Sequence, residues 1–176
     1  MTSRRLAAAV LLGLLLCGCG ASRTARRPAP DGKPWLSPQG GAPLPDAAER
    51  LARARFRSPV EGTVSDRFGG RGGGRHAGVD ILASGGTEVR AAAQGIVVYA
   101  GDGMRGYGNA VVLDHGEGVT TLYGHLEAIR VESGDAVPDG AVIGAVGRTG
   151  NATTYHLHFE IHVDGVPVDP LAHLTS

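Results

Sequence analysis

Glycine, which supplies 29 of the 176 residues, is the feature that most limits what this sequence can fold into. Glycine is disfavoured inside helices and provides the backbone angles of tight turns, so this content favours short strands joined by turns over a helical bundle. Ten prolines and an aromatic content of only 5% favour the same conclusion. Because 42% of the residues are hydrophobic, the chain can bury one sizeable core, and we expect a single folded domain with extensions.

From Arg57 onward, short β-branched runs alternate with glycine-rich turns. The HGEG segment lies between VVL and VTTLY, as a hairpin turn would, and VDGVPV contains the Asp-Gly pair that tight hairpins favour. The sequence shows neither a repeated period nor an alternation of strands with helices, which argues against a parallel α/β fold. We therefore predict a mainly β, antiparallel, sandwich-like domain over residues 57–176.

The first 18 residues have the order of an export signal. Arg4 and Arg5 precede the apolar run LAAAVLLGLLL, which is too short for an ordinary membrane-spanning helix and is followed by small residues. The ending LCGC resembles a bacterial lipobox in which Cys19 would be lipidated, and a plain secretory signal cut nearby is the alternative. Since Gly20 follows Cys19 in place of a retention aspartate, we expect a lipid anchor in the outer membrane, facing the periplasm of the cell envelope.

Residues 19–56 are predicted to tether the domain, because they are rich in proline, glycine and arginine and lack apolar periodicity before residue 45. The segment PDAAERLARARF has apolar residues near helical spacing, and a short helix over residues 46–56 and a continued linker are equally good interpretations. No cysteine follows Cys19, so no disulfide can hold the domain. The formal net charge is zero, and we expect no nucleic-acid partner.

The stretch YHLHFEIH, residues 155–162, places three of the seven histidines at alternate positions. In a strand, His156 and His158 would share one face with Glu160 and His162, while the apolar residues between them would face the core. This pattern alone has an ordinary explanation, because an amphipathic strand needs polar residues on its outer face. The strand therefore becomes a candidate site only if ligands from elsewhere in the chain join it.

Further candidate ligands stand in HAGVD, where His76 and Asp80 are four positions apart. Both can bind one ion only if the backbone folds back between them, and Gly78 lies where such a bend costs least. Two histidines and one carboxylate form a ligand set typical of catalytic zinc. A further histidine, His125, follows a predicted strand in the segment YGHL.

These elements, in this order, resemble the lysostaphin-type zinc metallopeptidases, also called LytM-domain peptidoglycan endopeptidases, over about residues 58–174. The resemblance rests on SDRFGGR, HAGVD, AAAQGIVVYAG, GYGNAVVLDHG, TLYGHL, GDAVPDGAVIGAVGRTG, HLHFEI and VDPLAHL. It implies an antiparallel β fold with the active site in a groove. It also implies a zinc site and assigns roles to five residues: zinc ligands at His76, Asp80 and His158, and a catalytic pair at His125 and His156.

The other polar residues of these motifs have simpler expected roles. Asn109 matches a family position near the groove, and we expect it to contact substrate. His115 and His173 are expected to be structural or exposed, and His162 to be solvated. Three arginines near HAGVD could attract the carboxylates of peptide stems, but a solvated glycine-rich loop is the default interpretation; they are Arg67, Arg71 and Arg75.

The resemblance predicts a zinc-dependent endopeptidase that hydrolyses the peptide cross-links of bacterial peptidoglycan. The alternative is a catalytically silent LytM-domain protein that activates cell-wall amidases and would have an amidase as partner. The complete ligand set favours the enzyme, because some such activators have lost ligands. A metal-storing or carbohydrate-binding β module would explain the fold but not the joint presence of His125 and His156.

Overall fold

The computed structural model of the protein describes residues 46–71 and 74–175. The predicted signal, Cys19 and most of the predicted tether lie outside the described residues. Within these two ranges, no helix has the length and apolar character needed to cross a bilayer. In chain order the elements are α1 (Ala47–Ala54), β1 (Phe56–Arg57), β2 (Thr63–Asp66), β3 (Gly69–Arg71), β4 (Gly74–His76), β5 (Val79–Leu82), β6 (Glu88–Arg90), β7 (Gly95–Gly101), β8 (Asn109–Asp114), β9 (Val119–Ile129), β10 (Ala136–Val137), β11 (Val142–Val146), β12 (His156–Val163), β13 (Val166–Val168), the 3₁₀ helix η1 (Pro170–Ala172) and β14 (Leu174–Thr175).

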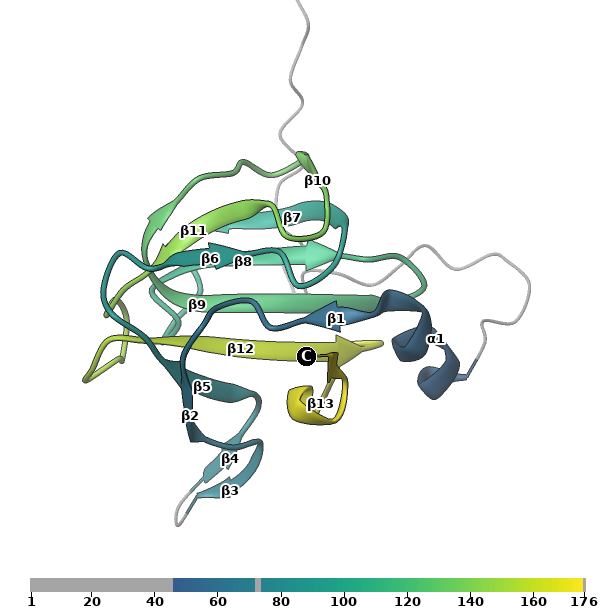
Figure 1. Ribbon diagram of the computed structural model, residues 1–176, viewed down its shortest axis with the longest axis horizontal. Helices are drawn as coiled ribbons and strands as arrows, with labels where there is room; N and C mark the ends of the chain where they lie inside the picture. Colours follow the sequence, from purple (N-terminus) through teal and green to yellow (C-terminus); the bar gives the residue numbers. More distant parts are fainter. Residues whose placement is uncertain (1–45, 72–73, 176) are drawn as a thin grey trace, which may run out of the picture.

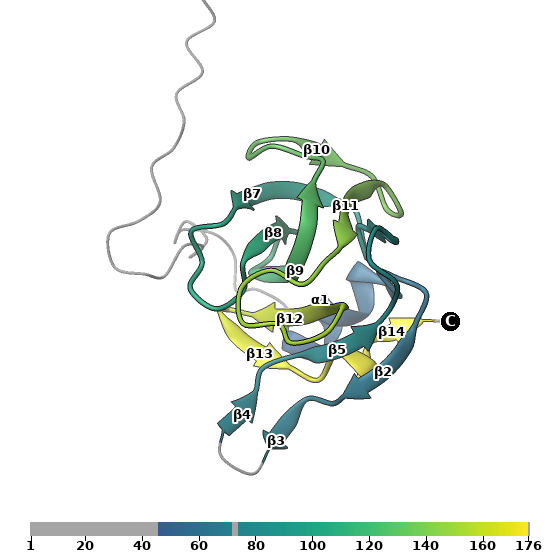
Figure 2. The same cartoon turned by 90° about the vertical axis from the view of Figure 1, so that its left-hand side faces the viewer.

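One large antiparallel sheet dominates the structure, and its central path runs β10–β7–β8–β9–β12–β5–β2 (Figure 1). Strand β11 pairs with both β6 and β9, and β13 pairs with β12. The short hairpin β3–β4 projects away from this sheet in both views (Figures 1 and 2). Strands β1 and β14 form a small parallel pair that brings the two ends of the described chain together. The predicted mainly β, antiparallel fold is therefore confirmed.

Both predicted hairpins are present. Strands β8 and β9 pair on either side of the HGEG turn, in which Glu117 and its two flanking glycines have positive φ. Strands β12 and β13 are joined at Asp164 and Gly165, with φ values of 52° and 78°. Two consecutive positive φ angles suit the right-handed twist of a tight hairpin, which is why the Asp-Gly pair predicted it.

Strand β12 alternates as the sequence predicts on its apolar side. Leu157, Phe159 and Ile161 are fully buried in the core. The opposite side is not solvated, however, since Glu160 is only 1% exposed and His158 only 7%. The expectation that His162 is solvated is also wrong, because its side chain is 14% exposed and pairs with Glu160. Tyr107 covers part of this face, because its ring lies 5.5 Å from the His158 ring and its hydroxyl donates to Glu160.

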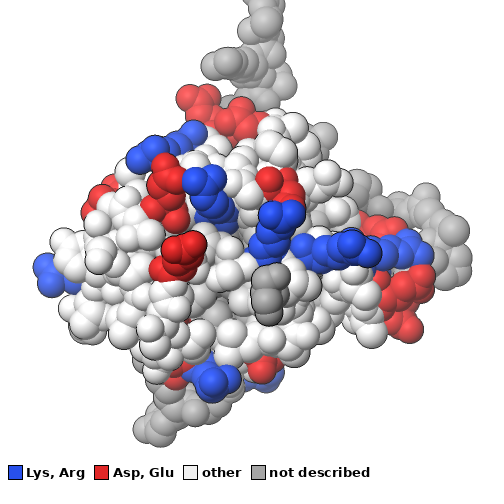
Figure 3. All heavy atoms as spheres, viewed as in Figure 1, with Lys and Arg blue, Asp and Glu red and all other residues white. Residues whose placement is uncertain are grey.

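Helix α1 packs against the sheet domain and carries Leu51 into the core. Asp46 caps its first turn by accepting from the backbone N–H of Glu49 at 2.9 Å. The buried Arg50 guanidinium donates to both carboxylate oxygens of Asp164, at 2.9 and 2.8 Å, and so ties the helix to the β12–β13 turn. Acidic and basic side chains lie side by side on this face (Figure 3). The packed region therefore begins before Arg57, the residue predicted to start the domain.

Candidate metal centre

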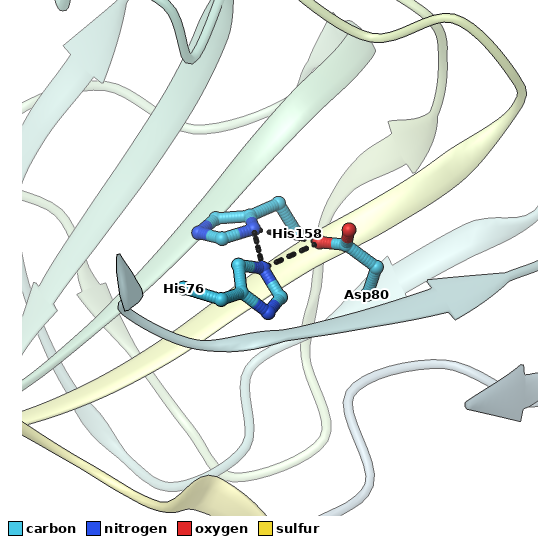
Figure 4. Close-up of side chains that lie close together, drawn as sticks. All are labelled: His76, Asp80 and His158. Carbon is cyan, nitrogen blue, oxygen red and sulfur yellow. Dashed lines mark hydrogen bonds and ion pairs between the residues drawn. The ribbon is translucent and has the colours of Figure 1, made fainter. Parts of the chain in front are cut away.

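Three predicted ligands meet where β12, β5 and the end of β4 come together, and Figure 4 shows their side chains pointing toward one another. The Oδ1 atom of Asp80 lies 2.7 Å from His158 Nδ1 and 3.1 Å from His76 Nε2. The two histidine nitrogens are 3.2 Å apart. Asp80 and His158 face each other directly because they are paired residues in the antiparallel register of β5 and β12. His76 ends β4 and closes the cluster from the projecting hairpin.

Gly78 allows β5 to approach β12 closely, which differs from the role predicted for it. It is not among the glycines with positive φ. A Cβ atom on Gly78 would instead lie 2.2 Å from the carbonyl oxygen of Phe159. The glycine is therefore needed for the tight packing of the strand pair that carries Asp80 and His158, and not for a left-handed bend.

The cluster has the dimensions of a zinc site. Ligand bonds of 2.0–2.2 Å in a tetrahedral arrangement separate neighbouring ligand atoms by about 3.3 Å. The three separations in the structure range from 2.7 to 3.2 Å. Two nitrogens and one carboxylate oxygen leave one tetrahedral position for water or substrate, as catalytic zinc sites do. The residues present therefore fit a zinc ion.

The remaining nitrogen of each ligand histidine has an acceptor. His76 Nδ1 donates to the carbonyl oxygen of Arg67 at 2.9 Å, which leaves Nε2 to face the cluster. His158 Nε2 donates to Glu160 at 2.7 Å, which leaves Nδ1 to face it. Such partners fix the tautomer and the orientation of metal-binding histidines. Both rings are thus held ready to present a lone pair to a cation.

His158 and Glu160 each shift the pKa of the other. Burial alone would lower the pKa of His158, but hydrogen bonds to Asp80 and Glu160 outweigh it and raise the pKa to about 9. Burial would raise the pKa of Glu160, but the hydrogen bonds from His158 and His162 lower it to about 2. A metal ion at His158 Nδ1 has to compete with a proton, so its binding strengthens as the pH rises.

His125 and His156 lie beside the cluster with their ring centroids 4.7 Å apart. His125 Nδ1 donates to the carbonyl oxygen of Thr149 at 2.8 Å, and His156 Nδ1 donates to that of Thr154 at 3.0 Å. In each ring, therefore, Nε2 is the atom left to exchange a proton. Burial lowers the pKa of His125, and the neighbouring His156 lowers it further. His125 also has a φ of 63°, an uncommon angle for a residue other than glycine, and such strain concentrates at functional sites.

All five predicted metal and catalytic residues line one groove of about 470 Å³. One wall is the loop of residues 151–154, and the other includes Ser65 and Asp66 at the end of β2. The site is therefore open enough to receive an extended chain while its reactive side chains stay mostly buried.

The model of peptidase family M23 matches residues 74–170, which include the whole cluster. The chain belongs to peptidase family M23. Among curated relatives, this chain is 47% identical over 97 residues to the DD-carboxypeptidase/endopeptidase Mpg of Neisseria meningitidis, an alignment that covers 55% of this chain and 22% of Mpg. It is 40% identical over 119 residues to the murein hydrolase activator NlpD of Escherichia coli, covering 68% of this chain and 31% of NlpD. The chain thus spans less than a third of the length of either relative.

Solved structures agree with this assignment. The M23 domain is similar to lysostaphin from Staphylococcus simulans, with a TM-score of 0.61 and 34% identity, over 64% of this chain and 49% of that chain. It is also similar to a zinc containing peptidase from Vibrio cholerae, with a TM-score of 0.60 and 32% identity, over 65% of this chain and 39% of that chain. The lysostaphin-type resemblance predicted from the motifs is confirmed.

Asn109 binds two segments that flank His125 in the M23 domain. Its side-chain amide donates to the carbonyl oxygen of Leu126 at 3.0 Å, and its backbone N–H donates to the hydroxyl of Thr149 at 3.0 Å. It is not among the residues that line the groove. These contacts support the backbone on either side of the His125 ring, and the substrate contact expected for Asn109 stays a prediction.

Two residues of the M23 site were missed by the sequence analysis. Glu160 binds the outer nitrogen of His158, and the Tyr107 hydroxyl donates to Glu160 at 2.8 Å. Burial and the adjacent carboxylate raise the pKa of Tyr107, so its hydroxyl keeps its proton. The alternation of β12 already put Glu160 on the ligand face, which was a usable signal. Nothing in the sequence around Tyr107, in the turn before β8, pointed to this contact.

Proposed function

We propose that this chain is a zinc-dependent peptidoglycan endopeptidase that hydrolyses peptide cross-links of the bacterial cell wall. The observation that carries the proposal is the complete His76, Asp80 and His158 cluster with two further histidines beside it in one groove. Membership of peptidase family M23 and similarity to the endopeptidase Mpg support it.

In this proposal His76 Nε2, Asp80 Oδ1 and His158 Nδ1 hold the zinc ion. When bound, zinc would supply Lewis-acid activation of the scissile carbonyl group and of water. His125 and His156 present Nε2 to the groove, where each can take a proton from water, return it to the leaving amine, or donate a hydrogen bond to the developing oxyanion. The peptide stems of peptidoglycan would lie along the groove between the two walls.

We further propose that the domain acts from a lipid anchor at Cys19, at the outer membrane and facing the periplasm. Residues 20–45 would then serve as the tether that gives the domain its reach to the wall. The name of a 43% identical relative from Pseudomonas aeruginosa, lipoprotein NlpD/LppB homolog, supports an envelope location.

A second function is favoured by one specific observation, the 40% identity to the murein hydrolase activator NlpD over 68% of this chain. In that case the groove of this chain would not turn over peptide, and the protein would act by stimulating a cell-wall amidase. The intact ligand cluster is the reason to place the enzyme first.

The test uses the full chain, purified in detergent, with peptidoglycan sacculi, and reads the released muropeptides by mass spectrometry. Release that needs zinc, stops with a chelator and is lost in His158→Ala supports the endopeptidase. His173→Ala is the matched control, because it makes the same chemical change outside the groove. Release that persists in His158→Ala refutes the zinc mechanism. No release by this chain alone, together with more release by an added amidase than the amidase gives by itself, supports the activator.

A further inference from the structure

We propose that Glu160 is a positioning residue of the metal site. It orients His158 and is itself held in place by Tyr107 and His162. The inference rests on the proposed function, since it concerns the same metal site. Glu160 would not touch zinc or substrate. It would act through His158, by fixing which nitrogen of that ring faces the cluster.

The contacts of Glu160 are those of a fully enclosed carboxylate. Its side chain is 1% exposed. Oε1 accepts from His158 Nε2 at 2.7 Å and from the Tyr107 hydroxyl at 2.8 Å, while Oε2 pairs with His162 Nε2. The partners given by the structure are thus one phenol and two imidazoles, with no lysine or arginine among them. The carboxylate is arranged around the histidine and not around a permanent positive charge.

A carboxylate at this position needs an explanation, because burying a charged group is costly unless it is paired and hydrogen-bonded. An apolar residue would satisfy a position inside a covered sheet more simply. What the carboxylate provides is an acceptor for His158 Nε2–H, on the side of the ring opposite Asp80 and His76. With that proton held, the neutral ring has its lone pair on Nδ1, the atom that faces the cluster.

Tyr107 connects this arrangement to the second part of the site. Its hydroxyl holds Glu160, and its carbonyl oxygen accepts the backbone N–H of His125 at 2.8 Å. Its ring also lies against His158, with the ring centroids 5.5 Å apart. Tyr107 therefore contacts both Glu160, which supports the proposed ligand His158, and the backbone of the proposed proton-transfer residue His125. Its substitution should affect the metal site through Glu160.

The test measures the zinc dissociation constant of the full chain at fixed pH, by competition with a chromophoric chelator, together with thermal unfolding of the metal-free protein. Loss of an outer hydrogen-bond partner of a metal-binding histidine typically weakens binding 10–100-fold. We expect a loss in this range for Glu160→Ala, a partial rescue for Glu160→Gln, which keeps an acceptor oxygen, and a smaller loss for Tyr107→Phe.

Tyr123→Phe is the matched control. Its hydroxyl is also buried and hydrogen-bonded, accepting from the Ala92 N–H at 2.8 Å and contacting the Thr121 hydroxyl at 3.0 Å, but it lies away from the metal cluster. This variant should lose thermal stability and keep the parent affinity for zinc. The comparison separates positioning of the metal from a general loss of packing, which would lower stability alone.

Zinc affinity within twofold of the parent in a folded Glu160→Ala would overturn the inference. If Glu160→Ala does not fold, affinity within twofold of the parent in both Glu160→Gln and Tyr107→Phe would overturn it. The proposed function fails in a different way, through absence of muropeptide release from sacculi. If zinc binding depends on Glu160 but the protein does not cut sacculi, this inference holds and the endopeptidase proposal is refuted.

Discussion

Replacing Gly78 with alanine tests whether the metal centre depends on the close approach of β5 to β12. The added Cβ would lie 2.2 Å from the carbonyl oxygen of Phe159 and 2.7 Å from Cγ of Glu160. Carbon–oxygen contacts between strands are normally about 3.3–3.6 Å long. The two strands must therefore separate by about 1 Å, because the closest atom belongs to the backbone and cannot rotate away.

This displacement should lower both stability and zinc affinity. Overpacking a core costs about 1–3 kcal/mol, and a backbone clash belongs near the upper end, which corresponds to a fall in melting temperature of about 10 °C for a domain of this size. The Asp80–His158 ligand separation of 2.7 Å would change by a similar distance. Since metal sites tolerate about 0.2 Å, we expect the zinc dissociation constant to rise more than about tenfold.

The assays are thermal unfolding of the metal-free chain and chelator competition for zinc. Gly101→Ala is the control, because its added Cβ would meet Tyr99 at 3.4 Å, an ordinary contact, and Gly101 does not have positive φ. Gly101→Ala should stay within about 0.5 kcal/mol of the parent. If Gly78→Ala matches Gly101→Ala in melting temperature and zinc affinity, the close approach does not hold the ligands in place and the reasoning is wrong.

Three further predictions concern the histidines. His125→Ala should slow muropeptide release from sacculi about 10²–10⁴-fold while the zinc dissociation constant is unchanged, and release at the parent rate would exclude a proton-transfer role. Zinc at 100 times its dissociation constant should add about 2.7 kcal/mol to the free energy of unfolding; a chelator or His158→Ala should abolish this gain, and an equal gain in that variant would contradict the ligand assignment. Burial lowers the pKa of His115, so its contribution to stability is complete above about pH 6.5 and is lost as the pH falls through the lower pKa of the folded state. Urea titrations should therefore show a shallower loss of stability in acid for His115→Gln than for the parent, whereas parallel curves would refute the assignment.

Local patterns predicted the features that local geometry controls. Alternation along β12 put His156, His158 and Glu160 on one face, because successive side chains of any strand point to opposite sides. The Asp-Gly pair at Asp164 predicted its hairpin, because the required backbone angles belong to those two residues. Neither inference needed any knowledge of what lies next to the strand.

The depth of the site could not be predicted in this way. Alternation says which side of β12 Glu160 is on, but not that Tyr107, from a distant turn, packs against that side. For the same reason the sequence could not decide whether α1 packs or stays in the tether. That depends on Arg50 reaching Asp164, which is 114 residues away in the chain.

The pairing of Asp80 with His158 depends on register, which two separate glycines help to set. A slip of β5 by one residue would turn Asp80 to the opposite face and remove it from the cluster. Gly78 admits the carbonyl oxygen of Phe159 on one side of β5, and a Cβ on Gly62 would lie 2.2 Å from the carbonyl oxygen of Leu82 on the other. Any slip would bring a bulkier residue to at least one of these contacts. The high glycine content that first indicated a turn-rich fold therefore also serves the metal centre, because two of these glycines let the strands pack in the register that pairs Asp80 with His158.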